Sequence, residues 1–513
     1  MALKSNKRAL EKAARTSKWP SDLGTIGITQ ATAEDFKWLQ AHVVGEVCLP
    51  GDADYDSLRA QNPLYPVAPQ AIVMCAAFED VRACLQFSAK HGLWVMPRAG
   101  RHSSAGFSTN TGLVIDVSRI SYAVVDPERR TARVGAGTSF GVLNAQLDVY
   151  RLHVPGGTCP DVCVAGFMQG GGYGFTSREL GMGCDSIIGA LVMLADGRVV
   201  VANDRVNHDL FWAIRGGTGA NFGVLLELTF ALEPIWKLFG YAIAWPLADA
   251  PRVLDALQSQ FMTGKNDVRV GYLCVLTTLK EGQVLTMIGT YHGTEEEGRR
   301  ALAPVVGIGS PRWLLAETDT YAVLNEALLN VLPGPGDAGT IELKEAHYIA
   351  QPVGVPRWET MCQAFAKTPN TYNIACIEPY GGQINLRPKL WNAFVHREVS
   401  MDFFVDAFWN PIWPESPDEK GAQAFLDAMM KSMAPTFDTF VYQNYPRRQM
   451  PDFRWAYWGD AFPSLLFIKD KYDPENVFHF EQSVTPYPAD PGIHRSTARS
   501  LFHDPHIQYP PWS

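Results

Sequence analysis

The stretch "VMPRAGRHSSAGFSTNTG", residues 95–112, places one histidine, His102, inside a loop of small residues that follows a predicted strand. Glycine and other small residues let a backbone approach a ligand closely and turn its N–H groups toward phosphate oxygens. Further glycine clusters follow at 135–141, 156–157 and 170–174. Glycine-rich loops at several places along one segment predict an extended ligand that several turns hold together.

Two of these clusters resemble nucleotide-binding turns only in part. The cluster "VGAGTSFG", residues 134–141, follows a predicted strand and precedes a predicted helix, as a dinucleotide-binding turn would. Its spacing is G-x-G-x-x-x-G, however, and no acidic residue ends a strand about 20 residues further on. The cluster "GGGYGF", residues 170–175, also fails to match, and the P-loop spacing is absent. The sequence therefore argues against a nicotinamide-binding Rossmann turn.

Composition and charge exclude several classes of function. The chain has 513 residues, enough for two domains, and a formal net charge of −9 without a long basic run. This argues against nucleic acid or an anionic membrane as a partner. No run approaches the ~18 apolar residues of a membrane span, and the basic N-terminus lacks the apolar core of a secretory signal. Nine cysteines without CxxC spacing predict neither a disulfide framework nor a metal site, so we expect a cytoplasmic globular protein.

Hydrophobic periodicity divides the chain into two regimes. In the first, short apolar strands such as 71–77 alternate with helices such as 78–92, which ends at a glycine. The pair Asp196-Gly197 predicts a tight hairpin turn in the same regime. Over residues 239–440 the strands are longer and alternate in polarity, with helices between them. This second pattern predicts an antiparallel sheet with covering helices.

Four motifs resemble those of one flavoprotein family. Arg98, Gly100, His102 and Ser103 form the pattern R-x-G-x-H-S, which resembles the flavin-attachment loop of the vanillyl-alcohol oxidase superfamily. Three further stretches are similar, in the same order, to signatures of its berberine-bridge-enzyme subgroup: "GGTCPDVCVAGFMQGGGYG" (156–174), "DLFWAIRGGTGANFGV" (209–224) and "YDPENVFHFEQSV" (472–484). The resemblance is strong over residues 65–235 and weaker over 375–485.

The resemblance implies an α+β fold of two domains. One is a PCMH-type FAD-binding domain like that of vanillyl-alcohol oxidase, and the other is a substrate domain built on an antiparallel sheet. The chain then divides into an N-terminal extension (1–64), the FAD-binding domain (65–238), the substrate domain (239–455), a berberine-bridge-like segment that returns to the FAD-binding domain (456–486) and an extended tail (487–513).

The resemblance also implies FAD bound through two covalent links, with His102 on the flavin 8α-methyl carbon and Cys159 on C6 of the ring. Cys163 follows four residues later, but the family's Cys-Pro-x-Val pattern selects Cys159. Without this context a loop histidine is more often a surface or core residue, and a free cysteine more often a small buried hydrophobe. The other residues expected to bind the cofactor are Arg98, Gly100, Arg101, Ser103, Ser104, Gly106, Gly157, Val162, Gly166, Gly171, Gly172, Gly174, Val224 and Asn476.

The substrate domain is expected to supply a base, because a proton must leave the substrate while FAD accepts a hydride. In the predicted strand "VSMDFFVDAFW" (399–409), Asp402 and Asp406 fall on one face, since side chains alternate along a strand. Asp406 is the first candidate base and Asp402 the second; the alternative is that both acids face solvent. The stretch "VYQNYPRR" (441–448) resembles the family's Tyr-x-Asn-Tyr segment, which makes Tyr445 a further candidate and Tyr442 its reserve.

The expected function is oxidation of an alcohol, with a small-molecule substrate, O₂ as acceptor and H₂O₂ as product. In the family a valine three residues after the attachment cysteine leaves room for O₂, and Val162 occupies that position. The alternatives are a flavin dehydrogenase with another acceptor, an enzyme that oxidises amines or alkaloids, and a non-catalytic binding protein. Tryptophans of the second half of the chain either stack on a sugar or aromatic substrate or belong to the core: Trp358, Trp391, Trp409, Trp413, Trp455 and Trp458. Substrate identity and oligomeric state stay open.

Overall fold

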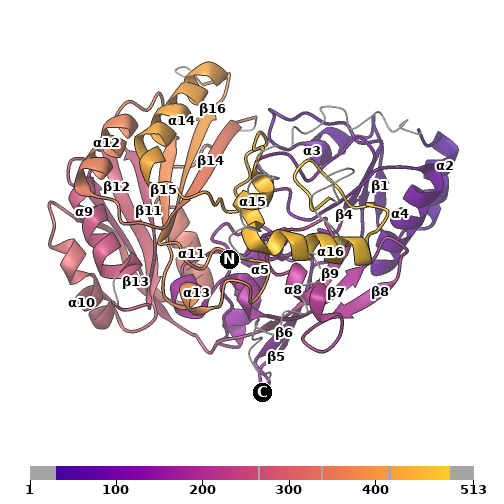
Figure 1. Ribbon diagram of the computed structural model, residues 1–513, viewed down its shortest axis with the longest axis horizontal. Helices are drawn as coiled ribbons and strands as arrows, with labels where there is room; N and C mark the ends of the chain where they lie inside the picture. Colours follow the sequence, from indigo (N-terminus) through magenta and orange to yellow (C-terminus); the bar gives the residue numbers. More distant parts are fainter. Residues whose placement is uncertain (1–29, 264–265, 337–338, 414–416, 486–513) are drawn as a thin grey trace, which may run out of the picture.

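A computed structural model describes residues 30–485, except 264–265, 337–338 and 414–416. The predicted tail (487–513) and the basic N-terminal stretch lie outside these residues. Within the described chain, no helix combines the length and apolarity that crossing a membrane requires. Two bodies of secondary structure face each other in Figure 1, with the N-terminal and C-terminal parts of the described chain in one and the middle of the chain in the other.

The first body contains two sheets. One has the order β1-β2-β4-β3, in which β2, β4 and β3 are parallel and β1 pairs antiparallel with β2. The other has the order β5-β6-β9-β7-β8 and is antiparallel. The strands are β1 (Glu46–Cys48), β2 (Ala71–Met74), β3 (Val95–Arg98), β4 (Leu113–Asp116), β5 (Ala123–Asp126), β6 (Thr131–Gly135), β7 (Ile187–Met193), β8 (Val199–Ala202) and β9 (Val224–Ala231). Strand β1 lies within the predicted N-terminal extension (1–64) and belongs to the same sheet as β2.

Two local predictions in this body, a helix and a hairpin, are confirmed. The predicted helix over 78–92 is α4 (Phe78–His91), and it ends where Gly92 adopts a left-handed conformation with φ 62°. The predicted hairpin is the β7–β8 pair, with Gly197 at φ 81° in its turn. The other helices of this body are α2 (Ala33–Ala41), α3 (Tyr55–Arg59), α5 (Phe140–Val149), α6 (Val164–Gln169), α7 (Ser177–Leu180) and α8 (His208–Ala213), with a short 3-10 turn η1 (Gly183–Ser186).

The second body is one antiparallel sheet of order β13-β10-β12-β11-β15-β16-β14, as the alternating pattern predicted. Its strands are β10 (Leu238–Pro246), β11 (Val270–Leu279), β12 (Gly282–Tyr291), β13 (Arg312–Asp319), β14 (Ile341–Ile349), β15 (Ile374–Pro379) and β16 (Met401–Trp409). Its helices are α9 (Ala250–Leu257), α10 (Glu295–Val306), α11 (Tyr321–Leu329), α12 (Val355–Phe365), α13 (Gln383–Leu386) and α14 (Glu419–Met433), with short turns η2 (Gln258–Met262) and η3 (Ala434–Thr436).

The two faces of this sheet have different partners. Helices α9, α10, α12 and α14 cover the outer face, as Figure 1 shows, and pack with it into one apolar core. Strand β16 contributes Phe403 and Val405 to that core, whereas Phe404 packs into the core shared with the first body. Since side chains alternate along a strand, Asp402 and Asp406 lie on the same inner face as Phe404. Both acids are buried, so the solvent-facing alternative does not apply.

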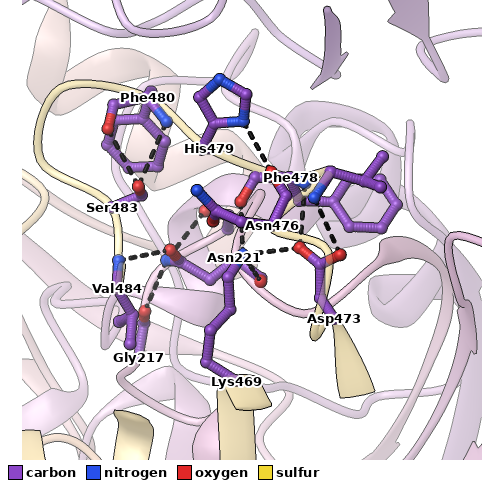
Figure 2. A network of polar contacts seen from close by, with 12 residues as sticks. Gly217, Asn221, Lys469, Asp473, Asn476, Phe478, His479, Phe480, Ser483 and Val484 are labelled. Carbon is purple, nitrogen blue, oxygen red and sulfur yellow. Dashed lines mark hydrogen bonds and ion pairs between the residues drawn. The ribbon is translucent and has the colours of Figure 1, made fainter. Parts of the chain in front are cut away.

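The C-terminal segment returns to the first body. Helices α15 (Phe453–Trp458) and α16 (Phe462–Tyr472) are joined by the short turn η4 (Gly459–Ala461), and α16 packs against α8. At the end of α16, the ammonium of Lys469 lies 2.6 Å from the Asp473 carboxylate and donates to the backbone carbonyls of Asn221 and Phe478 (Figure 2). This buried contact holds the loop that follows α16, up to Val484, against the turn of residues 217–221.

Candidate active site

A cavity of about 500 Å³ lies where the glycine-rich loops of the first body meet the inner face of the seven-stranded sheet. Residues from distant parts of the sequence line this cavity. Of the residues predicted for the site, those that line it are Arg98, Gly100, Arg101, His102, Ser103, Ser104, Gly157, Cys159, Val162, Gly166, Val224, Asp406 and Tyr445. The expected attachment histidine and cysteine therefore share one cavity with a candidate acid and a candidate tyrosine.

The two loops that carry His102 and Cys159 lie in direct contact. A Cβ atom on Gly100 would come within 2.9 Å of the backbone nitrogen of Cys163, so only glycine permits this approach. Across the contact, Nε2 of His102 lies 3.1 Å from the Asp161 carboxylate. The loop is anchored from behind by Arg98, whose Nε donates to Asp116 at 2.7 Å. The imidazole and the 159–161 segment are thereby brought to the same wall of the cavity.

The two cysteines of this region differ in accessibility. Cys159 has an accessible thiol, whereas Cys163 is buried and its thiol donates to the carbonyl of Gly137 at 3.2 Å. Burial raises the pKa of Cys163 to about 11. The pKa of Cys159 is also raised, first by burial and then by the charge of Asp161. Both cysteines border the cavity, and Cys159 is the more exposed of the two.

Opposite this wall, a tyrosine and a buried acid form a hydrogen-bonded pair. The hydroxyl of Tyr445 donates to Oε1 of Glu378 at 2.7 Å, and both residues line the cavity. Glu378 is 4% exposed, and burial raises its pKa to about 7. Burial, followed by the Glu378 charge, holds the pKa of Tyr445 well above its usual value. At neutral pH the phenol of Tyr445 is protonated, and the carboxyl of Glu378 is close to the midpoint of its titration. This arrangement is suitable for passing a proton.

A buried cation lies beside this pair. The Lys344 ammonium is 2.6 Å from Asp406 and 3.4 Å from Glu342, and it lies 4.8 Å from the centre of the Tyr445 ring. Burial disfavours the charge on Lys344, but the two carboxylates outweigh it and raise the pKa of the ammonium. Asp406, the first candidate base from the sequence, is therefore engaged in an ion pair. Glu378 instead accepts a hydrogen bond from the tyrosine with one of its oxygens.

Several predicted site residues do not line the cavity. The Tyr442 hydroxyl accepts from the backbone N–H of Gly172 at 2.8 Å and from the side-chain amide of Asn444 at 2.9 Å, which makes it part of the framework beneath the site. Asp402 is fully buried beside Glu378, its register partner on the neighbouring strand. Gly106, Gly171, Gly172, Gly174 and Asn476 shape supporting turns, Asn476 with φ 52°. No tryptophan lines the cavity within the described residues, and Trp358, Trp409 and Trp458 belong to the core.

The sequence reading missed Glu378, Lys344 and Glu342. Glu378 is the one charged residue of the strand "IACIEP", and an acid inside an apolar run was a usable signal. Lys344 and Glu342 lie in a strand of mixed polarity, where charged residues are ordinary. Only the pairing of β14 with β16 brings Lys344 opposite Asp406.

Comparison with known proteins identifies the chain's relatives. A family model described as "FAD binding domain" matches residues 69–203, and one described as "Berberine and berberine like" matches residues 441–485. Chitooligosaccharide oxidase of Gibberella zeae is 30% identical over 455 residues, which cover 83% of this chain and 89% of that protein. This chain belongs to the berberine-bridge-enzyme-like family of FAD-linked oxidoreductases.

Further members share the same fold and length. The FAD-linked oxidoreductase YvdP of Bacillus subtilis is 29% identical over 86% of this chain and 98% of its own length. The solved structure of Physcomitrella patens BBE-like 1 superposes with a TM-score of 0.77 at 24% identity, over 88% of this chain and 99% of that one. A solved chitooligosaccharide oxidase superposes with the same TM-score and identity over 88% of this chain and 100% of its own. The enzyme is thus an FAD-dependent oxidoreductase with the two-domain α+β fold.

The residues on the cavity fit FAD. The 98–106 loop approaches the 159–163 segment so closely that Gly100 has no room for a side chain, and such backbone can follow an extended cofactor. His102 and Cys159 both border the cavity, and both are exposed residues. When bound, FAD supplies a hydride acceptor there.

Proposed function

We propose that this enzyme is an oxidase whose FAD is attached to both His102 and Cys159, and that it converts a hydroxyl group of a neutral, hydroxyl-rich substrate into a carbonyl. The electrons pass to O₂ and give H₂O₂. The observation that supports the chemistry best is the Tyr445–Glu378 pair, which faces the same cavity as His102 and Cys159. We propose these two residues, in place of Asp406, as the group that removes the proton.

The geometry of the pair suggests how the proton moves. The Tyr445 oxygen uses its own hydrogen to bond Glu378, so its lone pairs are available to a substrate hydroxyl. As the substrate O–H bond breaks, its proton passes to the tyrosine oxygen while the phenolic proton passes to Oε1 of Glu378. The phenol therefore stays neutral throughout, in agreement with its raised pKa. Lys344, beside the ring, stabilises the negative charge that Glu378 carries before the pair takes up the substrate proton.

Polar lining supports a sugar-like substrate. Five polar residues line the cavity together with the proposed base: Glu342, Lys344, Asp406, Gln443 and Asn444. Curated relatives carry the names chitooligosaccharide oxidase, carbohydrate oxidase and xylooligosaccharide oxidase. An oligosaccharide with a free hydroxyl at its end is the substrate class that we propose.

A substrate panel under air tests this function. Oligosaccharides, benzylic alcohols and alkaloids are supplied in turn, and H₂O₂ release is measured together with product. We expect one H₂O₂ for each oligosaccharide oxidised. Reduction of the flavin by an oligosaccharide without H₂O₂ would identify a dehydrogenase, and turnover of only amines or alkaloids would overturn the substrate class.

Attachment of the flavin is directly measurable. We expect the denatured, acid-precipitated enzyme to stay yellow, because two covalent links survive unfolding. His102→Ala and Cys159→Ala should each keep flavin through the remaining link, while the double variant should release it into the supernatant. Cys163→Ala is the matched control, since that thiol is buried against Gly137 and should leave attachment unchanged. Free flavin released from the wild type by acid would refute covalent attachment.

Val162, which lines the cavity, is expected to control access of O₂. Val162→Leu adds one methylene at the cavity wall, so it should slow reoxidation of the reduced flavin by O₂ and leave reduction by substrate nearly unchanged. The two half-reactions are measured separately by stopped-flow absorbance. Equal losses in both would show that Val162 acts only through packing.

A further inference from the structure

Asp402 is a buried acid that the proposed chemistry does not use. Its side chain is 0% exposed, and neither carboxyl oxygen has a hydrogen-bond partner among the described residues. The Phe403 amide faces the carboxyl without reaching hydrogen-bond geometry. An unpaired, ionised carboxylate in such a place would cost several kcal/mol, so the ionised form is strongly disfavoured.

The position of Asp402 relates it to the proposed base. In the antiparallel β15–β16 pair, Asp402 is the direct register partner of Glu378, which puts their Cβ atoms about 5 Å apart on one sheet face. Oε1 of Glu378 accepts a hydrogen bond from Tyr445. Its second oxygen, Oε2, is buried and has no hydrogen-bond partner within the described chain. Two adjacent buried carboxyl groups cannot both be ionised, because their charges repel each other. If one of them is protonated, its O–H can donate a hydrogen bond to the other.

We propose that Asp402 is a protonated carboxylic acid that donates a hydrogen bond to Oε2 of Glu378, directly or through one buried water, and so stabilises the ionised form of the base. Asp402 is a positioning residue in this scheme, because it acts on the substrate only through Glu378. The proposal rests on the proposed function, since it takes Glu378 as the proton acceptor.

The surroundings of Asp402 agree with a neutral acid. The titratable groups that face it from the packed elements are Glu378 on β15, Lys344 and Tyr348 on β14, Tyr380 after β15, and Tyr445. Burial and then the Glu378 charge raise the pKa of Asp402 well above its usual value, and Lys344 opposes them only in part. The hydroxyls of Tyr348 and Tyr380 bond each other at 2.9 Å. Glu378 therefore ionises first, with Asp402 still protonated.

During turnover the proton balance is simple. The substrate proton enters at Tyr445, the phenolic proton reaches Oε1 of Glu378, and Glu378 becomes neutral. Asp402 keeps its proton throughout, and the extra proton leaves Glu378 for solvent before the next cycle. Loss of the Asp402 donor should therefore make ionised Glu378 harder to form without removing the base itself.

The pH profile of flavin reduction tests this role. Asp402→Leu removes the donor and leaves similar bulk, so the acid limb of the profile should move up by about one to two pH units, or about ten- to a hundredfold in rate below the limb. Asp402→Asn keeps an N–H donor, so its rate should stay within about threefold of wild type at every pH. Thr277→Val is the matched control, since it replaces another fully buried side chain of this sheet whose hydroxyl lacks a partner, and it should not move the profile.

The pH profiles of the variants decide whether Asp402 acts as a protonated donor. An Asp402→Leu profile that superimposes on wild type, or an equal upward shift in Asp402→Asn, would overturn the proposal. If Asp402→Leu does not fold, Asp402→Asn still decides: an ionised Asp402 would make its acid limb move to lower pH, because a like charge next to Glu378 is lost. Glu378→Gln separates the two levels. If Glu378→Gln reduces flavin as wild type does, the proposed base is wrong; if it is slow but Asp402→Leu is unshifted, only the role of Asp402 is wrong.

Discussion

Glu378→Gln is expected to slow reduction of the flavin by substrate about 10²–10⁴-fold, which is the usual cost of losing a positioned base. Glutamine keeps the size of the side chain and can still accept a hydrogen bond from Tyr445, but it cannot take up the proton. Flavin content and thermal stability should stay close to wild type. In the unaltered enzyme the rate should rise with pH through about 7, because Glu378 is active only after losing its proton and its pKa lies there.

Tyr445→Phe provides the matched test of the same pathway. It removes only the hydroxyl that links substrate to Glu378, so it should slow reduction by a similar factor. Because both residues act on one proton, the double variant should be little slower than either single one. Single-turnover absorbance of the flavin measures all three rates. A larger loss in Asp406→Asn at equal flavin content would instead assign the base to Asp406.

Lys469→Met is expected to give the largest loss of stability, about 3–5 kcal/mol, because it leaves a buried carboxylate without its cation. Lys469 and Asp473 are both 0% exposed, and their charged atoms lie 2.6 Å apart (Figure 2). The two backbone N–H groups of Val477 and Phe478 that also bond Asp473 cannot replace the lost charge. The loop that bears Phe480 and Gln482, both on the cavity wall, should loosen as well.

The chain contains a matched control on the same helix. Lys471 lies two residues away, is 49% exposed in its side chain and pairs with Asp209 at 2.6 Å. Since Lys471 is half exposed, water screens its charge, and Lys471→Met should cost clearly less stability than Lys469→Met. Urea unfolding of the flavin-loaded enzymes compares the two variants. Equal losses would show that burial of the Lys469–Asp473 pair is unimportant, and recovery of stability in the Lys469→Met, Asp473→Asn double variant would confirm the unpaired charge as the cause.

The sequence by itself determined the features that depend on near neighbours. Helix α4 follows from a 3.6-residue period and ends at Gly92, where a left-handed backbone is needed. The alternation along β16 put Asp402 and Asp406 on one face without any structure. The glycine loops indicated an extended ligand, because glycine lets a backbone approach a ligand closely. The resemblance of the His102 motif to a flavoprotein family implied that this ligand is FAD.

Only the tertiary structure decided which of these residues act together. Glu378, Lys344 and Tyr445 come from β15, β14 and a loop, and no local period relates them. The strand order places Lys344 opposite Asp406 and Glu378 opposite Asp402. Asp406 is therefore engaged in an ion pair, and Asp402 lies beside the proposed base. The physical reason is that proton affinity depends on burial and neighbouring charge, and both arise from contacts between residues far apart in the chain.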